Sequence, residues 1–242
     1  MSIAFAADPK DAYEAKTFTA ADGFKLPYRI MAPAKIEPGK KYPLVIFLHG
    51  AGERGTDNAV QLVHGMSDFA SAENREKYPA FVVAPQCPQE LQWVAVPWAA
   101  DSHKMPEKPT AALAATLDLV TSLEKELPVD SHRLYITGLS MGGYGTWDAI
   151  QRQPKRFAAA APVCGGGDPA YAKEIKDIPL WAFHGDKDDV VKAARSTQMI
   201  DALKAVGGKP KYTLYPGVGH NSWSATYANP EFYAWLFAQK KS

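Results

Sequence analysis

Cysteine is nearly missing from this sequence, since Cys87 and Cys164 are the only two in 242 residues. Two cysteines cannot form the set of several disulfides that holds many small secreted domains together, and their spacing matches no metal site. The sequence therefore predicts no resident metal. It leaves open whether the two thiols are free and buried or joined in one disulfide.

Long apolar runs and an excess of one charge are missing as well. No apolar run reaches the roughly 18 residues that indicate a membrane span, so none is predicted. The 27 basic and 26 acidic residues leave a net charge of +1, and no Lys/Arg-rich patch stands out. Nucleic acid is therefore not an expected partner, whereas the oligomeric state is not indicated either way.

The N-terminal segment lacks most of what defines a signal peptide. The stretch AFA at residues 4–6, followed by Ala7 and Asp8, resembles the small-residue end of one, but the charged and apolar parts are missing. One interpretation makes residues 1–13 a signal-peptide remnant and flexible N-terminus, which predicts a secreted or periplasmic protein. The other is a cytoplasmic protein whose start is rich in alanine.

Apolar residues, by contrast, make up 46% of the chain and form short runs that alternate with helical patterns. Strands are predicted at 14–31 (two around a turn), 43–49, 80–85, 133–137, 157–163, 179–184 and 211–216, and helices at 110–127, 141–152, 190–206 and 230–240. This alternation predicts one α/β domain over residues 1–242, with a mainly parallel sheet of about eight strands and helices on both faces. The first two strands are expected to form an antiparallel edge, and no insertion is long enough for a large cap domain.

A serine among glycines follows one of these predicted strands. Residues 138–142, GLSMG, fit the pattern G-x-S-x-G. In a tight strand-to-helix turn this pattern holds the serine in a strained conformation and exposes its hydroxyl, while the glycines avoid clashes with the strand and helix. Ser140 is therefore a candidate nucleophile, with a glycine-rich turn as the alternative. The pattern alone is weak, and its place between strand and helix strengthens it.

A serine hydroxyl needs a base, and the base needs an acid to orient it. Ligands bind beyond the carboxyl ends of parallel strands, so both groups are expected on later loops that follow strands. The stretch FHGDKDDVV offers Asp186, Asp188 and Asp189, and YPGVGHNSW offers His220. The order serine, aspartate, histidine along the chain is that of the α/β-hydrolases.

Across residues 24–240 the sequence resembles the α/β-hydrolase superfamily, and within it the small esterases of the carboxylesterase, dienelactone-hydrolase and "predicted peptidase" type. The resemblance rests on LHGAGERG, APQCP, GLSMGGYGTW, PVCGGGD, FHGDKDDVV and GVGHNSW. It implies Ser140 as nucleophile and His220 as base. The superfamily pattern H-G-x-x-D-x-x-V favours Asp188 as the acid, with Asp189 as a possible helix cap and Asp186 as a turn residue.

The resemblance also implies which groups hold the oxyanion. These are the backbone N–H groups of Ala51, in the loop after the first buried strand, and Met141, just after the nucleophile. His49 and His184 are expected to be structural, and Glu53 and Arg54 to pair or to be solvated. No metal or organic cofactor is needed for this chemistry.

Four aromatic residues fall on the candidate loops or beside them: Trp93, Trp98, Tyr144 and Trp223. They are candidates for an apolar wall around an acyl or aryl group, with core packing as the alternative for each. An uncapped cleft and a trimmed signal would suit esters carried by an extracellular polymer. The sequence thus predicts a serine esterase acting on aryl or short-acyl esters, such as feruloyl or acetyl esters of plant polysaccharide.

Other activities remain open at this stage. A peptidase, thioesterase or phospholipase would use the same triad. A non-catalytic binding protein of the same fold would typically have lost one triad member, and all three are present. A dinucleotide-binding protein is disfavoured, because Gly50, Gly52 and Gly55 follow a strand but have no good helix start or acidic partner after them.

Overall fold

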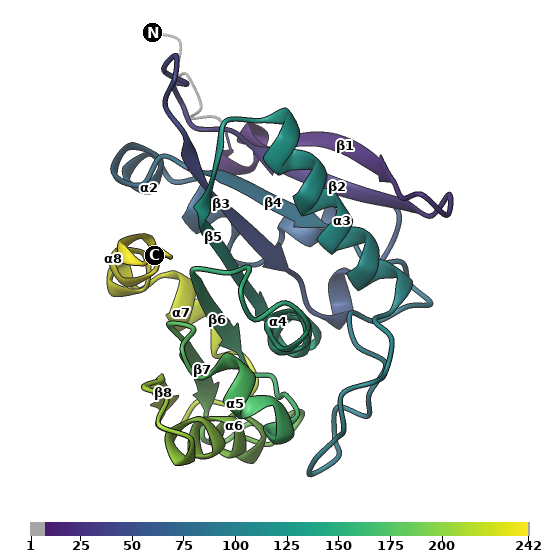
Figure 1. Ribbon diagram of the computed structural model, residues 1–242, viewed down its shortest axis with the longest axis vertical. Helices are drawn as coiled ribbons and strands as arrows, with labels where there is room; N and C mark the ends of the chain where they lie inside the picture. The colour runs from purple at the N-terminus through teal and green to yellow at the C-terminus, as the bar shows by residue number, and fades with distance from the viewer. Residues whose placement is uncertain (1–7, 242) are drawn as a thin grey trace, which may run out of the picture.

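A computed structural model describes residues 8–241, which form one open sheet with helices on both faces (Figure 1). The strands are β1 (Glu14–Thr19), β2 (Lys25–Met31), β3 (Tyr42–Leu48), β4 (Phe81–Pro85), β5 (Val129–Leu139), β6 (Ala159–Val163), β7 (Trp181–Gly185) and β8 (Lys211–Tyr215). Their order in the sheet is β1-β2-β4-β3-β5-β6-β7-β8. Only β1 and β2 run antiparallel to their neighbours, so the predicted antiparallel edge is confirmed.

The helices bury the two faces of this sheet in two separate cores. They are α1 (Met66–Phe69), α2 (Ala72–Lys77), α3 (Ala111–Glu126), α4 (Met141–Arg152), α5 (Ala172–Ile175), α6 (Ala194–Ala205), α7 (Trp223–Tyr227) and α8 (Pro230–Ala238). Buried residues of α3, α4, α5 and α6 share one core, and those of α1, α7 and α8 share the other. Along β3, Ile46 faces the first core and its neighbours Val45 and Phe47 face the second, as the two-residue repeat of a strand requires.

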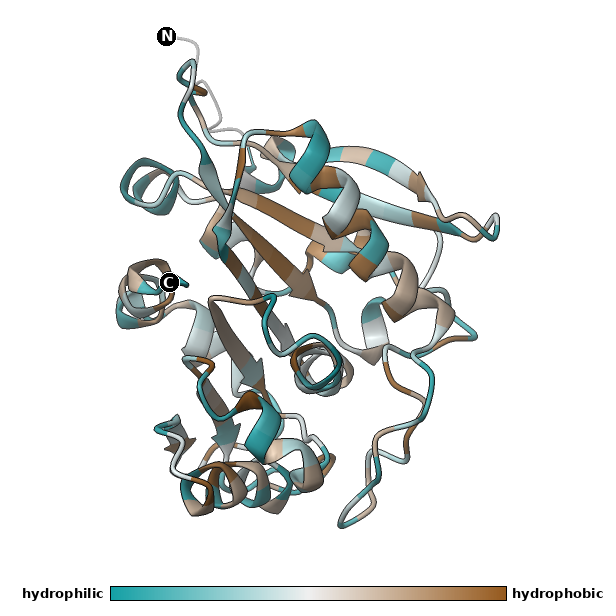
Figure 2. Ribbon diagram, in the orientation of Figure 1, coloured by the Kyte–Doolittle hydropathy of each residue, from teal (hydrophilic) through white to brown (hydrophobic). Residues whose placement is uncertain are grey.

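The central strands are apolar because both of their faces are covered. Every residue of β3, β4, β6 and β7 is buried, whereas most of the edge strand β1 is exposed. Figure 2 shows the contrast as hydrophobic strands in the middle of the sheet and mixed colours at its margin. Continuous apolar runs are typical of parallel strands covered on both sides.

Most predicted elements are confirmed within a few residues. Helix α3 begins after Thr110, whose hydroxyl accepts a hydrogen bond from the Leu113 N–H, and it ends before Pro128. The helix predicted from residue 190 begins only at Ala194. The intervening residues instead form a turn that donates backbone hydrogen bonds to Asp188. The short helices α1, α2 and α7 were not predicted, because such short segments show no clear 3.6-residue repeat.

The predicted signal remnant at residues 4–6 lies outside the described residues, so export of the protein stays a prediction. The flexible segment expected over 1–13 does not extend to Tyr13. Residues Pro9–Ala12 form a 3-10 helix, and the buried Tyr13 hydroxyl donates to the Met66 carbonyl. Over residues 8–241, no helix has the length and apolar character needed to cross a bilayer.

Candidate active site

Ser140 occupies a strained turn between β5 and α4. Its backbone angles, φ 53° and ψ −115°, are rarely adopted by residues other than glycine. The surrounding structure must therefore offset the strain of this conformation. The neighbouring glycines make the turn possible. A Cβ on Gly142 would lie 1.9 Å from the Leu48 carbonyl oxygen, and one on Gly138 would lie 2.5 Å from the Gly142 carbonyl oxygen. The glycines of the predicted G-x-S-x-G turn are therefore required by close backbone packing.

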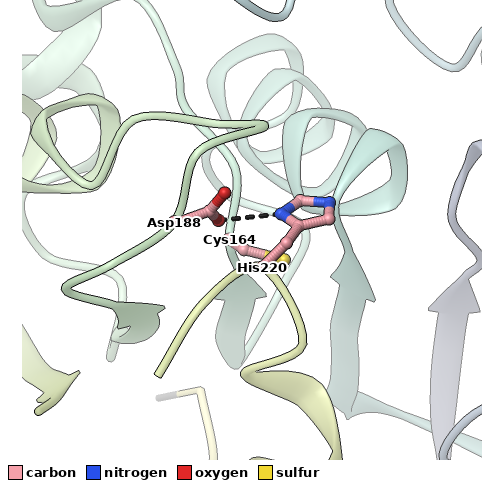
Figure 3. A group of neighbouring side chains, drawn as sticks. All are labelled: Cys164, Asp188 and His220. Carbon is pink, nitrogen blue, oxygen red and sulfur yellow. Dashed lines mark hydrogen bonds and ion pairs between the residues drawn. The ribbon is translucent and has the colours of Figure 1, made fainter. Parts of the chain in front are cut away.

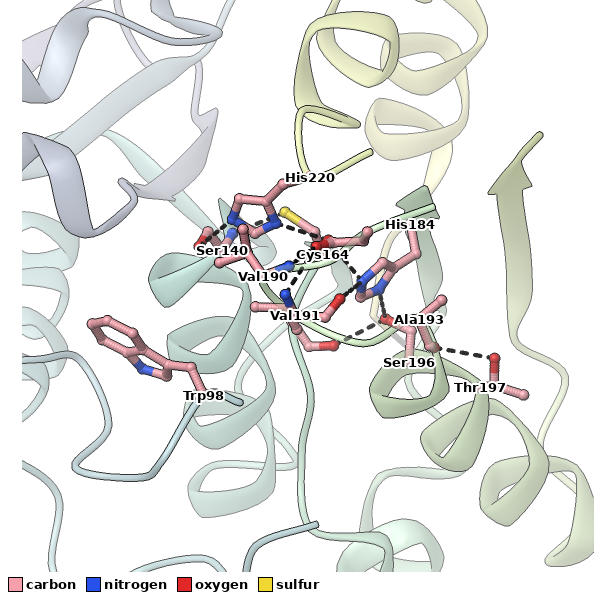
Figure 4. Close-up of polar contacts among 12 residues, drawn as sticks. Trp98, Ser140, Cys164, His184, Val190, Val191, Ala193, Ser196, Thr197 and His220 are labelled. Atoms are coloured by element: carbon pink, nitrogen blue, oxygen red, sulfur yellow. Dashed lines mark hydrogen bonds and ion pairs between the residues drawn. The ribbon is translucent and has the colours of Figure 1, made fainter. Parts of the chain in front are cut away.

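The loops after three separate strands bring Ser140, His220 and Asp188 together, as Figure 4 shows for Ser140 and His220 and Figure 3 shows for His220 and Asp188. The Ser140 Oγ lies 2.9 Å from His220 Nε2, and His220 Nδ1 lies 2.8 Å from Asp188 Oδ2. The His220 side chain is 19% exposed and Asp188 is fully buried beneath it. Because a carboxylate only accepts hydrogen bonds, Nδ1 carries the hydrogen and Nε2 is left to accept the Ser140 hydroxyl.

Asp188 is held as an anion by four polar contacts. Its Oδ1 accepts hydrogen bonds from the N–H groups of Val190 and Val191, and its Oδ2 accepts one from His220. His184 Nε2, which lies 2.9 Å from the Val191 carbonyl, is also 3.2 Å from Oδ2. Burial acts to raise the pKa of Asp188, but the hydrogen bonds from His184, His220 and Val191 outweigh it and lower this pKa well below its usual value. The carboxylate can therefore orient His220 at any physiological pH.

The two other aspartates of this loop are exposed and do not face His220. Asp186 accepts a hydrogen bond from the Gly217 N–H, as a turn residue does. Asp189 is exposed and lies five residues before Ala194, the first residue of α6, so it does not cap that helix. His184, expected to be purely structural, is fully buried and also contacts the Ser196 hydroxyl, so it supports the acid from behind.

Cys164 lies directly beneath the nucleophile and was not singled out from the sequence. Its Sγ accepts a hydrogen bond from the Ser140 N–H at 3.2 Å, and its backbone φ of 40° is also left-handed. Figure 3 shows it below Asp188 and His220. Its Sγ, a carboxylate oxygen of Asp188 and a ring nitrogen of His220 all lie within 4.8 Å of one another. Burial raises the pKa of the Cys164 thiol strongly, and the His220 and Asp188 atoms already bond each other, so these residues do not form a ready metal site. Both cysteines are free and buried.

The two predicted oxyanion donors each stand at the first position of a helix. Met141 opens α4, and Ala51 opens the 3-10 helix Ala51–Glu53, so neither N–H has an acceptor within its own helix. Their loops are in contact, because a Cβ on Gly50 would lie 2.8 Å from the Leu139 side chain. Within residues 8–241 neither N–H donates to another backbone or side-chain group.

Buried side chains brace the loop that carries Ala51. His49 Nδ1 contacts the Gly50 carbonyl, and its Nε2 accepts from the Cys87 N–H, while burial lowers the His49 pKa to about 4. The structural role expected for His49 agrees with these contacts. Arg54 donates to the carbonyls of Ala51 and Gln89 and does not pair with Glu53, so the first of the two alternatives for these residues, a pair, does not form.

Two of the four predicted substrate-contacting aromatics are core residues. Trp93 is fully buried, donates its indole N–H to the His49 carbonyl, and packs against Gly145. Tyr144 is 1% exposed and donates its hydroxyl to the Trp98 carbonyl. Their assignment to the pocket wall is therefore wrong, because both side chains pack into the first core, Tyr144 from α4 and Trp93 from the segment between β4 and α3.

Trp98 and Trp223 remain partly exposed, on opposite sides of the nucleophile. Trp223 stands edge-on to the His220 ring, with ring centroids 5.3 Å apart. Figure 4 shows Trp98 on the side of Ser140 away from His220. These two are the predicted aromatics that can meet a bound ester.

The segment that carries Trp98 is fastened to the helices of the first core. It leaves β4 and extends toward α5 and α6 before α3 begins (Figure 1). The buried Arg195 of α6 bonds the Asp101 carbonyl and the His103 ring, and Lys192 pairs with Asp101. Trp98 is thus held in place by contacts that its local sequence does not reveal.

An open, mostly parallel sheet of eight strands, with a serine on the tight turn between β5 and α4, defines an α/β-hydrolase. Comparisons with known proteins identify relatives of that fold that are named as ester hydrolases. The model of the Phospholipase/Carboxylesterase family matches residues 32–229, and the chain belongs to this family.

Individual relatives agree with this class. A crystal structure titled as a thermostable esterase superposes with a TM-score of 0.89 at 43% identity, over 96% of this chain and 64% of that one. A bifunctional acetylxylan esterase/xylanase of Neocallimastix patriciarum is 33% identical over 73 residues, which is 30% of this chain and 11% of the relative. Acyl-protein thioesterase 1 of Neurospora crassa is 26% identical over 211 residues, covering 74% of this chain and 80% of the relative. The chain thus spans less than two thirds of the first two proteins.

Proposed function

We propose that this protein is a serine esterase that forms an acyl-enzyme on Ser140 and acts on aryl or short-acyl esters, such as feruloyl or acetyl esters of plant polysaccharide. The observation that carries the proposal is the continuous hydrogen-bonded series from Ser140 Oγ through His220 to Asp188. Such a series activates a hydroxyl that is otherwise a poor nucleophile.

The mechanism follows from the placement of the hydrogens. His220 Nε2 takes the proton of Ser140 as Oγ attacks the ester carbonyl, and Asp188 stabilises the imidazolium that forms. The N–H groups of Ala51 and Met141 hold the oxyanion, and one such donor typically contributes ~10²–10³ in kcat. The alcohol leaves with the proton from His220. Water then attacks the acyl-enzyme by the same route.

Two observations support the proposed substrate class. The relative from Neocallimastix patriciarum is named as an acetylxylan esterase. In addition, Trp223 beside His220 and Trp98 on the other side of Ser140 are both partly exposed and offer apolar faces to an aryl or acyl group.

The experiment measures alcohol or acid release from p-nitrophenyl acetate, butyrate and octanoate, methyl ferulate, acetylated xylan and a peptide anilide. Wild type and Ser140→Ala are compared, and a loss of ~10⁶-fold in kcat is the expected scale. Activity that survives Ser140→Ala, or activity on the anilide alone, would refute the esterase. No activity on any substrate would favour a binding protein.

A thioesterase is the second candidate, because acyl-protein thioesterase 1 of Neurospora crassa matches over most of both chains. Palmitoyl and acetyl thioesters added to the panel separate the two activities. A kcat/KM for thioesters well above that for the matched oxygen esters would replace the proposal.

A further inference from the structure

We propose that Trp223, His64 and Glu53 form a subsite for the alcohol part of the ester, and that this subsite accepts a sugar or another polyol. The proposal rests on the proposed esterase function. It concerns which side of the scissile bond is recognised, and by which residues.

The proton that His220 delivers decides on which side of Ser140 the alcohol part of the ester lies. The leaving oxygen must come within hydrogen-bond reach of His220 Nε2, so the alcohol lies against whatever flanks this ring. Trp223 stands edge-on to this ring, with ring centroids 5.3 Å apart, and the centroid of the His64 ring lies 5.3 Å from that of Trp223. These three neighbouring rings, called the row below, therefore begin at the group that protonates the alcohol.

The carboxylate of Glu53 lies beside the His64 ring, and one of its oxygens has no hydrogen-bond partner within residues 8–241. Glu53 Oε1 lies 3.6 Å from His64 Nε2, and the Glu53 side chain is 13% exposed. Glu53 Oε2 and the indole N–H of Trp223 are both buried, and neither makes a hydrogen bond within residues 8–241. Buried polar atoms are nearly always paired in folded proteins, so these two are available to bond water or a ligand hydroxyl once the side chains around them move. Seven other buried polar atoms of the described residues are unpaired as well, and these two are set apart by their place beside His220.

The chemistry of the row selects the kind of alcohol. An indole offers an apolar face for the C–H groups of a ring, and a carboxylate beside an imidazole accepts and donates to hydroxyls. A simple alkyl or phenolic alcohol has no hydroxyl donor for Glu53. A phosphate-bearing alcohol, such as a phospholipid headgroup, would be repelled by its charge. A polyol is therefore the alcohol that uses every group of the row.

The opposite side of Ser140 is different in character. Trp98 lies there and offers the apolar face of its indole ring. That side suits the acyl group. The site thus has an apolar acyl side and a hydroxyl-binding alcohol side.

The test compares two acetates that give the same acetyl-enzyme, ethyl acetate and methyl 3-O-acetyl-β-xylopyranoside. Because kcat/KM covers the steps up to acylation, a difference between them reports the alcohol alone. Wild type is expected to prefer the sugar ester by about tenfold or more. Glu53→Gln and His64→Ala are expected to lower kcat/KM for the sugar ester by about tenfold, the scale of a lost hydrogen bond to a charged group, and to change ethyl acetate less than twofold.

The chain offers a matched control in His132 and Asp130. This pair has a similar separation of 3.4 Å but lies at the opposite end of β5 from Ser140, so His132→Ala is expected to leave both substrates unchanged. Methyl β-xyloside is also expected to inhibit wild type competitively and Glu53→Gln more weakly.

Three outcomes would overturn the subsite. Wild type could show no preference for the sugar ester. The variants could lower kcat/KM for both esters equally. Methyl β-xyloside could inhibit Glu53→Gln as strongly as it inhibits wild type. An equal loss on both esters would mean that the row only positions His220. Hydrolysis of both acetates that survives Ser140→Ala, or no hydrolysis at all, would instead refute the esterase itself.

Discussion

Replacing Gly142 by alanine is expected to damage both the fold and the active site. The added Cβ would lie 1.9 Å from the Leu48 carbonyl oxygen and 2.8 Å from that of His49. Real Cβ contacts essentially never fall below 3.0 Å, so α4 must move by about 1.1 Å relative to β3. Both opposing atoms belong to backbone, and neither can rotate away.

Overpacking of this kind typically costs about 1–3 kcal/mol, which corresponds to a Tm lower by about 2–12 °C for a chain of this size. Because the same movement displaces Ser140 and the Met141 N–H, kcat/KM on p-nitrophenyl acetate is expected to fall by ~10²-fold. Gly52→Ala is the control for stability, since its Cβ would meet nothing within 4 Å. A Gly142→Ala variant with wild-type Tm and activity would refute the packing argument.

Three further results are expected. Asp188→Asn should lower kcat by ~10⁴-fold with the fold retained, whereas Asp189→Asn, at an exposed position, should stay near wild type; comparable losses in both would remove Asp188 from its role. Because the folded-state pKa of Asp188 is lowered, its contribution to stability is present above the unfolded pKa of about 3.9 and lost as pH falls below that value. The Tm of Asp188→Asn should therefore depend less on pH than that of wild type between pH 5 and 2, and parallel curves would contradict this. Finally, Cys87 and Cys164 are buried and free, so Ellman's reagent should find no thiol in the native protein and two in denaturant; a native disulfide would leave none in either.

The sequence predicted the parts of this molecule that local patterns encode. Apolar runs located the strands, Thr110 and Pro128 marked the ends of α3, and G-x-S-x-G placed Ser140 on its turn. The choice of Asp188 came from resemblance to a family pattern. The structure gives it a physical basis, since only this aspartate is buried against His220.

What the sequence did not predict depends on contacts between distant segments. Trp93 looked like a pocket residue, yet its indole N–H bonds His49, 44 positions away. Cys164 showed no sign of contacting Ser140, because their contact depends on the ends of β5 and β6 meeting in the sheet. His64 follows no strand, so the rule that ligands bind beyond strand ends could not find it.

The assembly of the nucleophile turn from two strands has a consequence for folding. The Ser140 N–H is held by the Val163 carbonyl and the Cys164 thiol, and His220 arrives from a loop 80 residues further along the chain. Contacts of such long sequence separation form late, because the intervening chain must first be ordered. The hydroxyl can thus become nucleophilic only after the sheet is complete from β5 to β8. Ester hydrolysis is accordingly a measure of complete folding. During refolding, the recovery of ester hydrolysis should lag behind the recovery of helix content measured by circular dichroism.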